Sequence, residues 1–169
     1  MPDVTATTTP VHNHPFFELA RHPIKFRLFL FQKLPAAFFS GLRIKNLDEE
    51  GCTVSVPFKR FTQNPFGSTY FACLAMAAEM STGVLVMAQV YKRQPPVSML
   101  VLGMESKFYK KAVRETFFTC RDGVAVQDAA ARAIASREPQ TVKTHSRGLD
   151  AGGNLIAEFW ITWTLKAKG

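Results

Sequence analysis

One long apolar segment constrains the fold of this chain more than any other feature. Residues 67–91 read GSTYFACLAMAAEMSTGVLVMAQVY, long enough to span a bilayer, but Glu79 lies near the middle. A carboxylate at the centre of a bilayer costs about 2.5–3.5 kcal/mol on insertion scales. A helix that is apolar on most sides must instead lie inside other structure. We therefore expect no transmembrane segment and predict a buried core helix in a soluble domain, with its N-terminus at the small residues Gly67, Ser68 and Thr69.

Most of the remaining chain alternates apolar and polar residues, which is typical of half-buried strands. Residues 41–58 predict a hairpin around the turn DEEG at 48–51, and two more strands are expected between residues 100 and 121. Residues 124–137 are rich in alanine and predict a short helix, and two further strands flank a turn at 150–153. An antiparallel sheet wrapped around the long helix would bury it, so the predicted fold class is α+β.

Two segments precede this domain, which we assign to residues 41–169. Residues 1–15 are rich in threonine, resemble no secretory signal, and predict an arm outside the fold. Residues 16–40 place Phe and Leu at helical spacing among Arg and Lys, with Pro35 interrupting the run. We expect amphipathic helices whose Phe-rich face packs on the domain, although such basic segments are also typical of helices that lie on anionic membranes.

The charge balance favours an anionic partner. Lys and Arg number 21 against 13 Asp and Glu, giving a formal net charge of +8. No nucleic-acid recognition motif accompanies this charge, so we expect no nucleic-acid partner. Basic residues around the end of the long helix and the next hairpin form either a solvated face or a phosphate-binding cluster: Lys92, Arg93, Lys107, Lys110, Lys111 and Arg114.

Cysteine and histidine spacing predicts neither a disulfide framework nor a metal site. The cysteines are odd in number and widely spaced, which favours free thiols and a cytoplasmic location: Cys52, Cys73 and Cys120. Cys73 lies between apolar residues with no base nearby in sequence, so we expect an inert thiol. The histidines lack metal-ligand spacing: His12, His14, His22 and His145.

The order of elements, with the loop NPFGS at 64–68 leading into FACLAMAAEMSTGVLVMA, resembles the hotdog fold of acyl-CoA thioesterases. The resemblance covers roughly residues 41–168 and is nearest to a branch close to the phenylacetate-pathway thioesterases. It implies hydrolysis of an acyl-CoA or related thioester, with no cofactor beyond the coenzyme A of the substrate. It also implies a homodimer or a dimer of dimers, with the active site between subunits.

The resemblance also assigns roles to residues. Gly67 matches the position whose N–H polarises the thioester carbonyl, Asn64 the residue that places substrate or water, and Glu79 the acid that acts as base or nucleophile. Family members often carry His-Gly-Gly with the acid nine residues after the His. This chain has Phe66 in place of the His and Ala75 at the acid position, and Glu79 lies about one turn, or 6 Å, further along.

Six residues complete the predicted site as substrate-binding positions: Phe66, Ser68, Ser81, Thr82, Lys110 and Lys111. The two lysines suit the phosphates of coenzyme A. The Ser and Thr hydroxyls either contact substrate or water, or bond their own helix backbone. The departures at Phe66 and Ala75 keep a second hypothesis open, which is a non-catalytic module that binds an acyl or pantetheine ligand.

Overall fold

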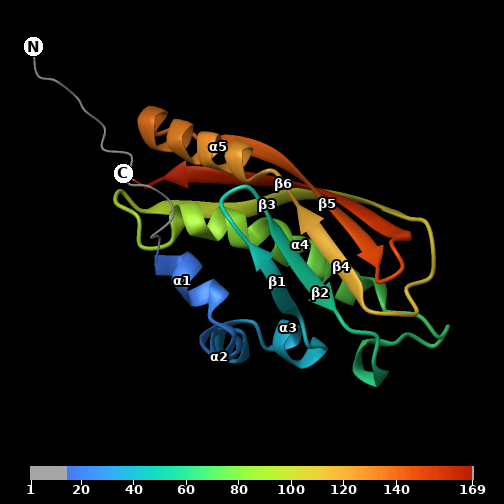
Figure 1. Ribbon diagram of the computed structural model, residues 1–169. Helices are drawn as coiled ribbons and strands as arrows, with labels where there is room; N and C mark the ends of the chain where they lie inside the picture. Colours follow the sequence, from blue (N-terminus) through green and yellow to red (C-terminus); the bar gives the residue numbers. More distant parts are fainter. Residues whose placement is uncertain (1–14, 169) are drawn as a thin grey trace, which may run out of the picture.

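A six-stranded antiparallel sheet wraps around the long helix α4, Phe71–Val90 (Figure 1). The computed structural model describes residues 15–168 of the chain. The strand order is β1-β2-β4-β5-β6-β3, and every neighbouring pair is antiparallel. This is the α+β hotdog architecture, and it confirms the fold class predicted from the sequence. The predicted arm, residues 1–15, lies outside the described residues except for Pro15, which begins α1.

The strands are β1 Arg43–Leu47, β2 Cys52–Val56, β3 Val97–Phe108, β4 Thr116–Cys120, β5 Gln140–Asp150 and β6 Leu155–Ala167. The shorter helices are α1 Pro15–Arg21, α2 Pro23–Lys33, α3 Pro35–Ser40 and α5 Gly123–Ser136, with a 3-10 turn, η2, at Arg60–Thr62. Each of the three N-terminal helices begins with proline. Proline lacks a backbone N–H, which suits the first helical position because an N–H there would have no partner within the helix.

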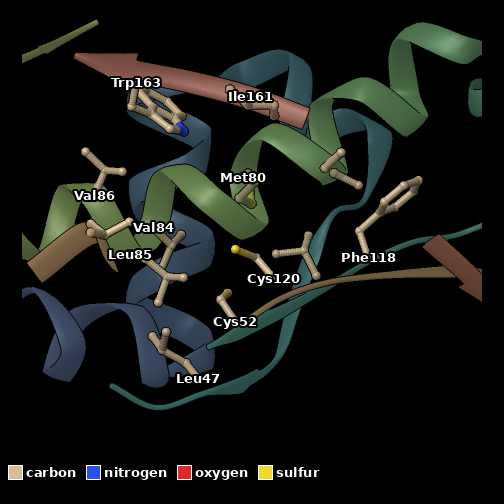
Figure 2. Packing of buried hydrophobic residues seen from close by; sticks show 14 of the residues in the cluster. Leu47, Cys52, Met80, Val84, Leu85, Val86, Phe118, Cys120, Ile161 and Trp163 are labelled. Carbon is tan, nitrogen blue, oxygen red and sulfur yellow. The ribbon is translucent and has the colours of Figure 1, made fainter. Parts of the chain in front are cut away.

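Strand β6, between β5 and β3, contributes a row of side chains to the hydrophobic core. Its alternate residues are buried, as the period of a strand requires: Ala157, Phe159, Ile161, Trp163 and Leu165. Figure 2 shows α4 side chains, among them Met80 and Leu85, in the same cluster as Phe118 and Trp163. The Phe118 ring packs directly on the backbone of Gly148, because a Cβ atom at this position would lie only 2.4 Å from the ring.

Helix α4 has the length and composition of a membrane span, but 67% of its apolar window is buried inside the protein. It starts at Phe71 rather than at Gly67, where the small residues predicted its N-terminus. The reason is local: Gly67 has a left-handed φ of 71°, which no helix residue can adopt. The preceding turn is held by Asn64, whose side chain accepts the N–H groups of Phe66 and Ser68.

Strand β3 differs from the other long strands because it lies at the edge of the sheet and pairs only with β6. Its alternating pattern predicts one buried face, yet its large apolar side chains are exposed. Leu100 is 61% exposed and Leu102 56%, with Met104 and Phe108 close behind. A row of unpaired backbone groups beside exposed apolar side chains is typical of a strand that pairs with another chain.

The N-terminal helices cover the opposite side of α4. Phe16, Phe17, Phe26 and Leu30 are buried and belong to the hydrophobic core, as expected for the Phe-rich face. Ile24, Leu28 and Phe31 lie on the other side of α2 and are exposed to solvent. Helix α2 therefore carries apolar residues on two faces, of which one is uncovered.

Candidate active site

One face of α4 is left uncovered by the other residues of 15–168. Ala72, Ala75 and Met76 are only partly buried, and Glu79, at the end of the same i, i+3, i+4, i+7 row, is exposed. Nearly all other residues of the helix, from Cys73 to Gln89, are buried. A reactive carboxylate on this helix can therefore meet a ligand only along this row.

Glu79 lies beside a small apolar cavity of about 80 Å³. The cavity is lined by side chains from α1, α2, α4 and β3: Phe16, Phe26, Phe29, Leu34, Glu79, Met80, Gly83, Val84, Met87 and Met99. Part of the Glu79 side chain reaches the surface, yet the surrounding protein desolvates its carboxyl group and raises its pKa. Within residues 15–168, no hydrogen bond or ion pair engages this carboxyl group.

Ser81 and Thr82 turn toward the sheet instead of sharing the row of Glu79. Ser81 Oγ donates to the Ala78 carbonyl at 2.8 Å and bonds Ser146 Oγ at 2.8 Å. Thr82 Oγ1 donates to the Glu79 carbonyl at 3.0 Å and accepts the Trp163 indole N–H at 3.0 Å. Both hydroxyls are fully buried and engaged, so these residues pack α4 on the sheet and do not belong to the candidate site.

The loop at 64–68 is closed by its own hydrogen bonds. Asn64 Oδ1 accepts the Phe66 and Ser68 N–H groups, and Asn64 Nδ2 donates to Ser68 Oγ at 3.1 Å. The Gly67 N–H donates to the Asn64 carbonyl at 3.1 Å. Gly67 is therefore not a free oxyanion donor, and the Asn64 side chain holds the loop. Phe66, 78% exposed, is the loop residue best placed to contact a ligand.

Free backbone donors lie four residues further on, at the true start of α4. The first intrahelical bonds are made by the N–H groups of Cys73 and Leu74, both to the Tyr70 carbonyl. Among residues 15–168, the N–H groups of Phe71 and Ala72 have no acceptor. Such groups carry the positive end of the helix dipole and favour a developing negative charge.

Lys110 and Lys111 lie close to this helix start. Thr69 donates from both its backbone N–H and its hydroxyl to the Ala112 carbonyl, at 2.7 and 3.1 Å. This contact ties the segment after β3 to the entrance of α4. Both lysines are exposed, and Lys110 Nζ donates to Asn154 Oδ1 at 2.9 Å. The segment that carries the two lysines therefore runs past the end of the helix where the two N–H groups are free.

The predicted basic cluster divides into two groups. Lys92 and Arg93 follow the C-terminal end of α4, before β3 begins, whereas Lys107, Lys110, Lys111 and Arg114 lie at or beyond the far end of β3. The strand has 12 residues, so the two groups are separated by roughly 35–40 Å. They do not form one cluster in a single chain, because β3 runs the length of the helix between them.

Glu79 and the free donors are also apart. Glu79 lies eight positions after Phe71, which corresponds to about 12 Å along the helix axis. A thioester carbonyl that accepts the Phe71 N–H cannot at the same time lie near the carboxylate of the same chain. The carboxyl group and the free donors of one chain thus lie at two separate places on α4.

Sequence reasoning missed a polar network on the outer face of the sheet. Glu158 accepts a hydrogen bond from Tyr109 Oη at 2.7 Å and contacts His145 Nε2 at 2.9 Å and Arg147 Nε at 3.5 Å. The Tyr109 hydrogen bond, followed by the interactions with His145 and Arg147, lowers the pKa of Glu158. The only signal in the sequence is that Glu158 alternates with apolar residues of β6. This alternation predicts that Glu158 lies on the outer face of the sheet, but it does not predict which residues contact it.

The cysteines lie in the interior. Burial raises the pKa of Cys73 and raises that of Cys120 to about 12, which makes both poor nucleophiles at neutral pH. Cys52 is also buried, and all three are free thiols. Within residues 15–168, no group of three or more His, Cys, Asp or Glu side chains is arranged to hold a metal ion.

The fold defines a hotdog protein, and solved structures agree on it. The Pseudomonas aeruginosa protein PA5026, described as a probable thioesterase, superposes with a TM-score of 0.72 at 21% identity, covering 86% of this chain and 97% of that one. A Shewanella oneidensis protein provisionally assigned as a thioesterase gives 0.72 at 12% identity, covering 90% and 99%. The thioesterase HI1161 of Haemophilus influenzae gives 0.62 at 12% identity, covering 85% and 90%.

The chain belongs to the family described as a domain of unknown function, DUF4442, which matches residues 25–165. The match includes α2 and α3 as well as the sheet and α4. No curated protein is similar enough in sequence to count as a relative. At these identities the structural likeness establishes the hotdog fold, and the reaction has to be argued from the residues of this chain.

Proposed function

We propose that the protein is a thioesterase that hydrolyses an acyl-CoA or a related acyl thioester. The observation that carries this proposal is the Glu79 carboxylate, which lies on the one uncovered row of the core helix beside an apolar cavity. An unpaired carboxylate in such surroundings costs free energy of folding, which favours a functional role for it. Its raised pKa suits a general base, because proton transfer is most efficient when the pKa of the base approaches the working pH.

In the proposed reaction, Glu79 takes a proton from a water molecule whose oxygen attacks the thioester carbonyl carbon. The carbonyl electron pair moves to oxygen, and the resulting oxyanion accepts hydrogen bonds from the Phe71 and Ala72 N–H groups at a helix start. When the carbonyl re-forms, the carbon–sulfur bond breaks and the departing thiolate takes the proton from Glu79. The products are a carboxylic acid and a free thiol.

The 12 Å offset between the two halves of this site is resolved if two copies of the chain pair through β3. Antiparallel pairing about a two-fold axis brings the Val97–Met99 end of one strand beside the Phe108 end of the other. Met99 lines the cavity next to Glu79, and the Phe108 end leads to the start of α4 through the bond from Thr69 to Ala112. The Glu79 of one subunit would then face the Phe71 and Ala72 N–H groups of its partner.

The same pairing accounts for other features of the surface. It would cover the exposed apolar residues of β3 and bring the Lys92 and Arg93 of one subunit toward the Lys110 and Lys111 of the other. These cations suit the phosphates of coenzyme A, the only cofactor that we invoke and one that belongs to the substrate. A cytoplasmic location remains our prediction, since the buried free thiols suit a reducing compartment.

The alternative is a binding module without turnover. It is favoured by the engaged Gly67 N–H and by Ala75 at the position where related thioesterases carry their acid. In that case the cavity and the lysines would hold an acyl or pantetheine ligand, and Glu79 would have no catalytic effect.

Thiol release from a panel of acyl-CoAs tests the proposal, with short, medium, long and phenylacetyl chains. The phenylacetyl ester tests the predicted likeness to the phenylacetate-pathway branch. We expect Glu79→Gln to lower kcat/KM by about 10²–10⁴-fold, as for loss of a general base. We expect Phe71→Pro, which removes one N–H from the helix start, to lower it by about 10²–10³-fold.

The matched control is Phe71→Ala, which removes the ring but keeps the N–H. Proline is tolerated at this first helical position, and Tyr70 already has the extended backbone that precedes a proline. An active wild type whose kcat/KM is unchanged in Glu79→Gln would contradict the proposed base. Ligand binding without turnover by the wild type would favour the binding module.

A further inference from the structure

The exposed side of α2 continues into a larger apolar surface, which we call the α2 patch. Ile24, Leu28 and Phe31 follow i, i+4, i+7 spacing along the helix and are 74%, 57% and 51% exposed. Phe31 packs edge-on against Phe39 of α3, which in turn contacts the Phe61 ring of η2 at 6.4 Å. The patch comprises Ile24, Leu28, Phe31, Leu34, Phe39 and Phe61. A contiguous exposed apolar surface of this kind marks an interaction site.

A basic cavity of about 410 Å³ adjoins the patch between α2 and β1. Four cations line it, with no carboxylate among its lining residues: Arg21, Arg27, Arg43 and Lys45. Apolar side chains such as Phe26, Leu42 and Ile44 form the rest of its wall together with backbone of β1. Lys45 is paired with Glu115 at 3.4 Å, so the three guanidinium groups are the cationic donors that the cavity offers to a ligand.

Two of these guanidinium groups are fixed by the fold. Arg21 Nε donates to the Leu47 carbonyl at 3.2 Å, and Arg27 donates to the Phe38 carbonyl at 3.3 Å while stacking 3.9 Å from the Phe38 ring. Burial, and then repulsion from Arg43, lower the pKa of Arg27. The like charges of Arg27 and Arg43, held close together, favour binding of an anion.

The cavity and the patch are in direct contact. The Phe38 ring that supports Arg27 also packs against Phe31 of the patch, with ring centroids 5.1 Å apart. On the other margin, Lys59 Nζ donates to the Phe39 carbonyl at 2.9 Å. Residues 19–47 contain no Asp or Glu and six cations: Arg21, Lys25, Arg27, Lys33, Arg43 and Lys45. The segment that carries most of the apolar surface thus contributes only positive charge beside it.

We propose that the α2 patch and its basic cavity dock the protein on an anionic phospholipid bilayer. The apolar side chains enter the boundary between headgroups and acyl chains, and the cationic side chains bind lipid phosphates. Apolar residues rimmed by cations match both chemical layers of such a surface. The docked face also adjoins the cavity beside Glu79, because Leu34 belongs to both.

Sedimentation of the full chain with extruded vesicles tests this proposal. The vesicles contain phosphatidylcholine alone, or phosphatidylcholine mixed with phosphatidylglycerol. We expect binding to the mixed vesicles, much weaker binding to phosphatidylcholine alone, and weakening as salt is raised. Equal binding to both kinds of vesicle, or binding to neither, would overturn the proposal.

Two variants and two controls locate the contact. We expect Ile24→Ser with Leu28→Ser to weaken binding to mixed vesicles at least tenfold, from the apolar area lost. We expect Arg43→Gln to weaken it roughly fivefold, which corresponds to one basic residue near the lipid surface. The controls on α5, Val124→Ser and Arg132→Gln, remove a comparable exposed apolar residue and a charge outside the patch and should bind like the wild type.

Every substituted residue is exposed, so the fold should survive, and Phe61→Ser on η2 is a second patch variant if the double variant does not fold. Two results would assign the surface elsewhere and overturn the proposal. In one, the patch variants lose self-association but keep vesicle binding, which would indicate that the patch binds a second copy of the chain. The other is binding of glycerol 3-phosphate by a protein that ignores both vesicles, which would indicate a soluble phosphate ester.

Discussion

Strands β6 and β3 carry similar alternating patterns, pair with each other over nearly their whole length, and yet differ completely in burial. On β6, Phe159, Ile161 and Leu165 are fully buried in the hydrophobic core. On β3, Leu100, Leu102 and Met104 are at least half exposed. The difference is position: β6 has a strand on each side, whereas β3 is the last strand of the sheet.

This comparison shows how the fold separates stability from function. The interior of the sheet and the sheet-facing side of α4 form a closed core. The β3 edge and the row that ends at Glu79 remain open, as expected of surfaces that meet a partner or a ligand. In the proposed dimer these open surfaces are completed together.

The largest effect on stability should come from the closed side. Phe159 is fully buried, and its ring lies 5.6 Å from those of Phe118 and Phe108. We expect Phe159→Ala to lower the free energy of unfolding by about 3–5 kcal/mol at every protein concentration. Leu100→Ala should lower the free energy of unfolding only by weakening the dimer, so the difference from wild type should disappear when the protein is diluted to the monomer. Urea denaturation at several concentrations distinguishes the two, and a concentration-independent loss in Leu100→Ala would break the comparison.

The β3 edge itself can be disrupted by charge. Leu102→Lys places a cation on each of the two strands that would pair, so we expect a monomer that keeps its fold. Sedimentation velocity of the wild type and the variant measures this shift. Val124→Lys on α5 introduces the same charge at a similarly exposed apolar position and should leave the association unchanged. A Leu102→Lys chain that still dimerises would exclude β3 as the interface.

The smallest effect concerns the stability contributed by Glu79. Desolvation raises its pKa in the folded state, so ionisation at neutral pH opposes folding. We expect Glu79→Gln to raise the melting temperature at neutral pH. The gain should vanish as the pH falls below the ordinary pKa of glutamate, about 4.3, where the carboxyl is protonated in both states. Melting curves across this range test the sign, and a destabilised variant would contradict it.

Much of this fold could be predicted from the sequence because its strongest signals are local. The apolar run from residue 67 to 91 marks the core helix, and the alternation from residue 155 to 166 marks β6. The start of α4 was misplaced because small residues in 67–69 resemble a helix N-terminus, whereas the Asn64 turn and the left-handed Gly67 delay it to Phe71. Nor can an alternating pattern indicate which strand lies at the edge of a sheet.

The candidate site divides in the same way. Glu79 could be found because a carboxylate inside an apolar run is conspicuous. The free N–H groups of Phe71 and Ala72 could not, because backbone donors leave no trace in residue type. The inward orientation of Ser81 and Thr82 depends on Ser146 and Trp163, which are more than 60 residues away in the sequence.

Mixing two inactive variants tests the central claim, which is that each site is built from two subunits. Glu79→Gln supplies an intact helix start, and Phe71→Pro supplies an intact carboxylate. If the halves of the site come from different subunits, a mixed dimer contains one complete site, and random assortment should restore about a quarter of wild-type thioesterase activity. Mixing with Leu102→Lys present in both chains should restore none. No recovery in the first mixture, from variants that exchange subunits, would contradict the two-subunit site.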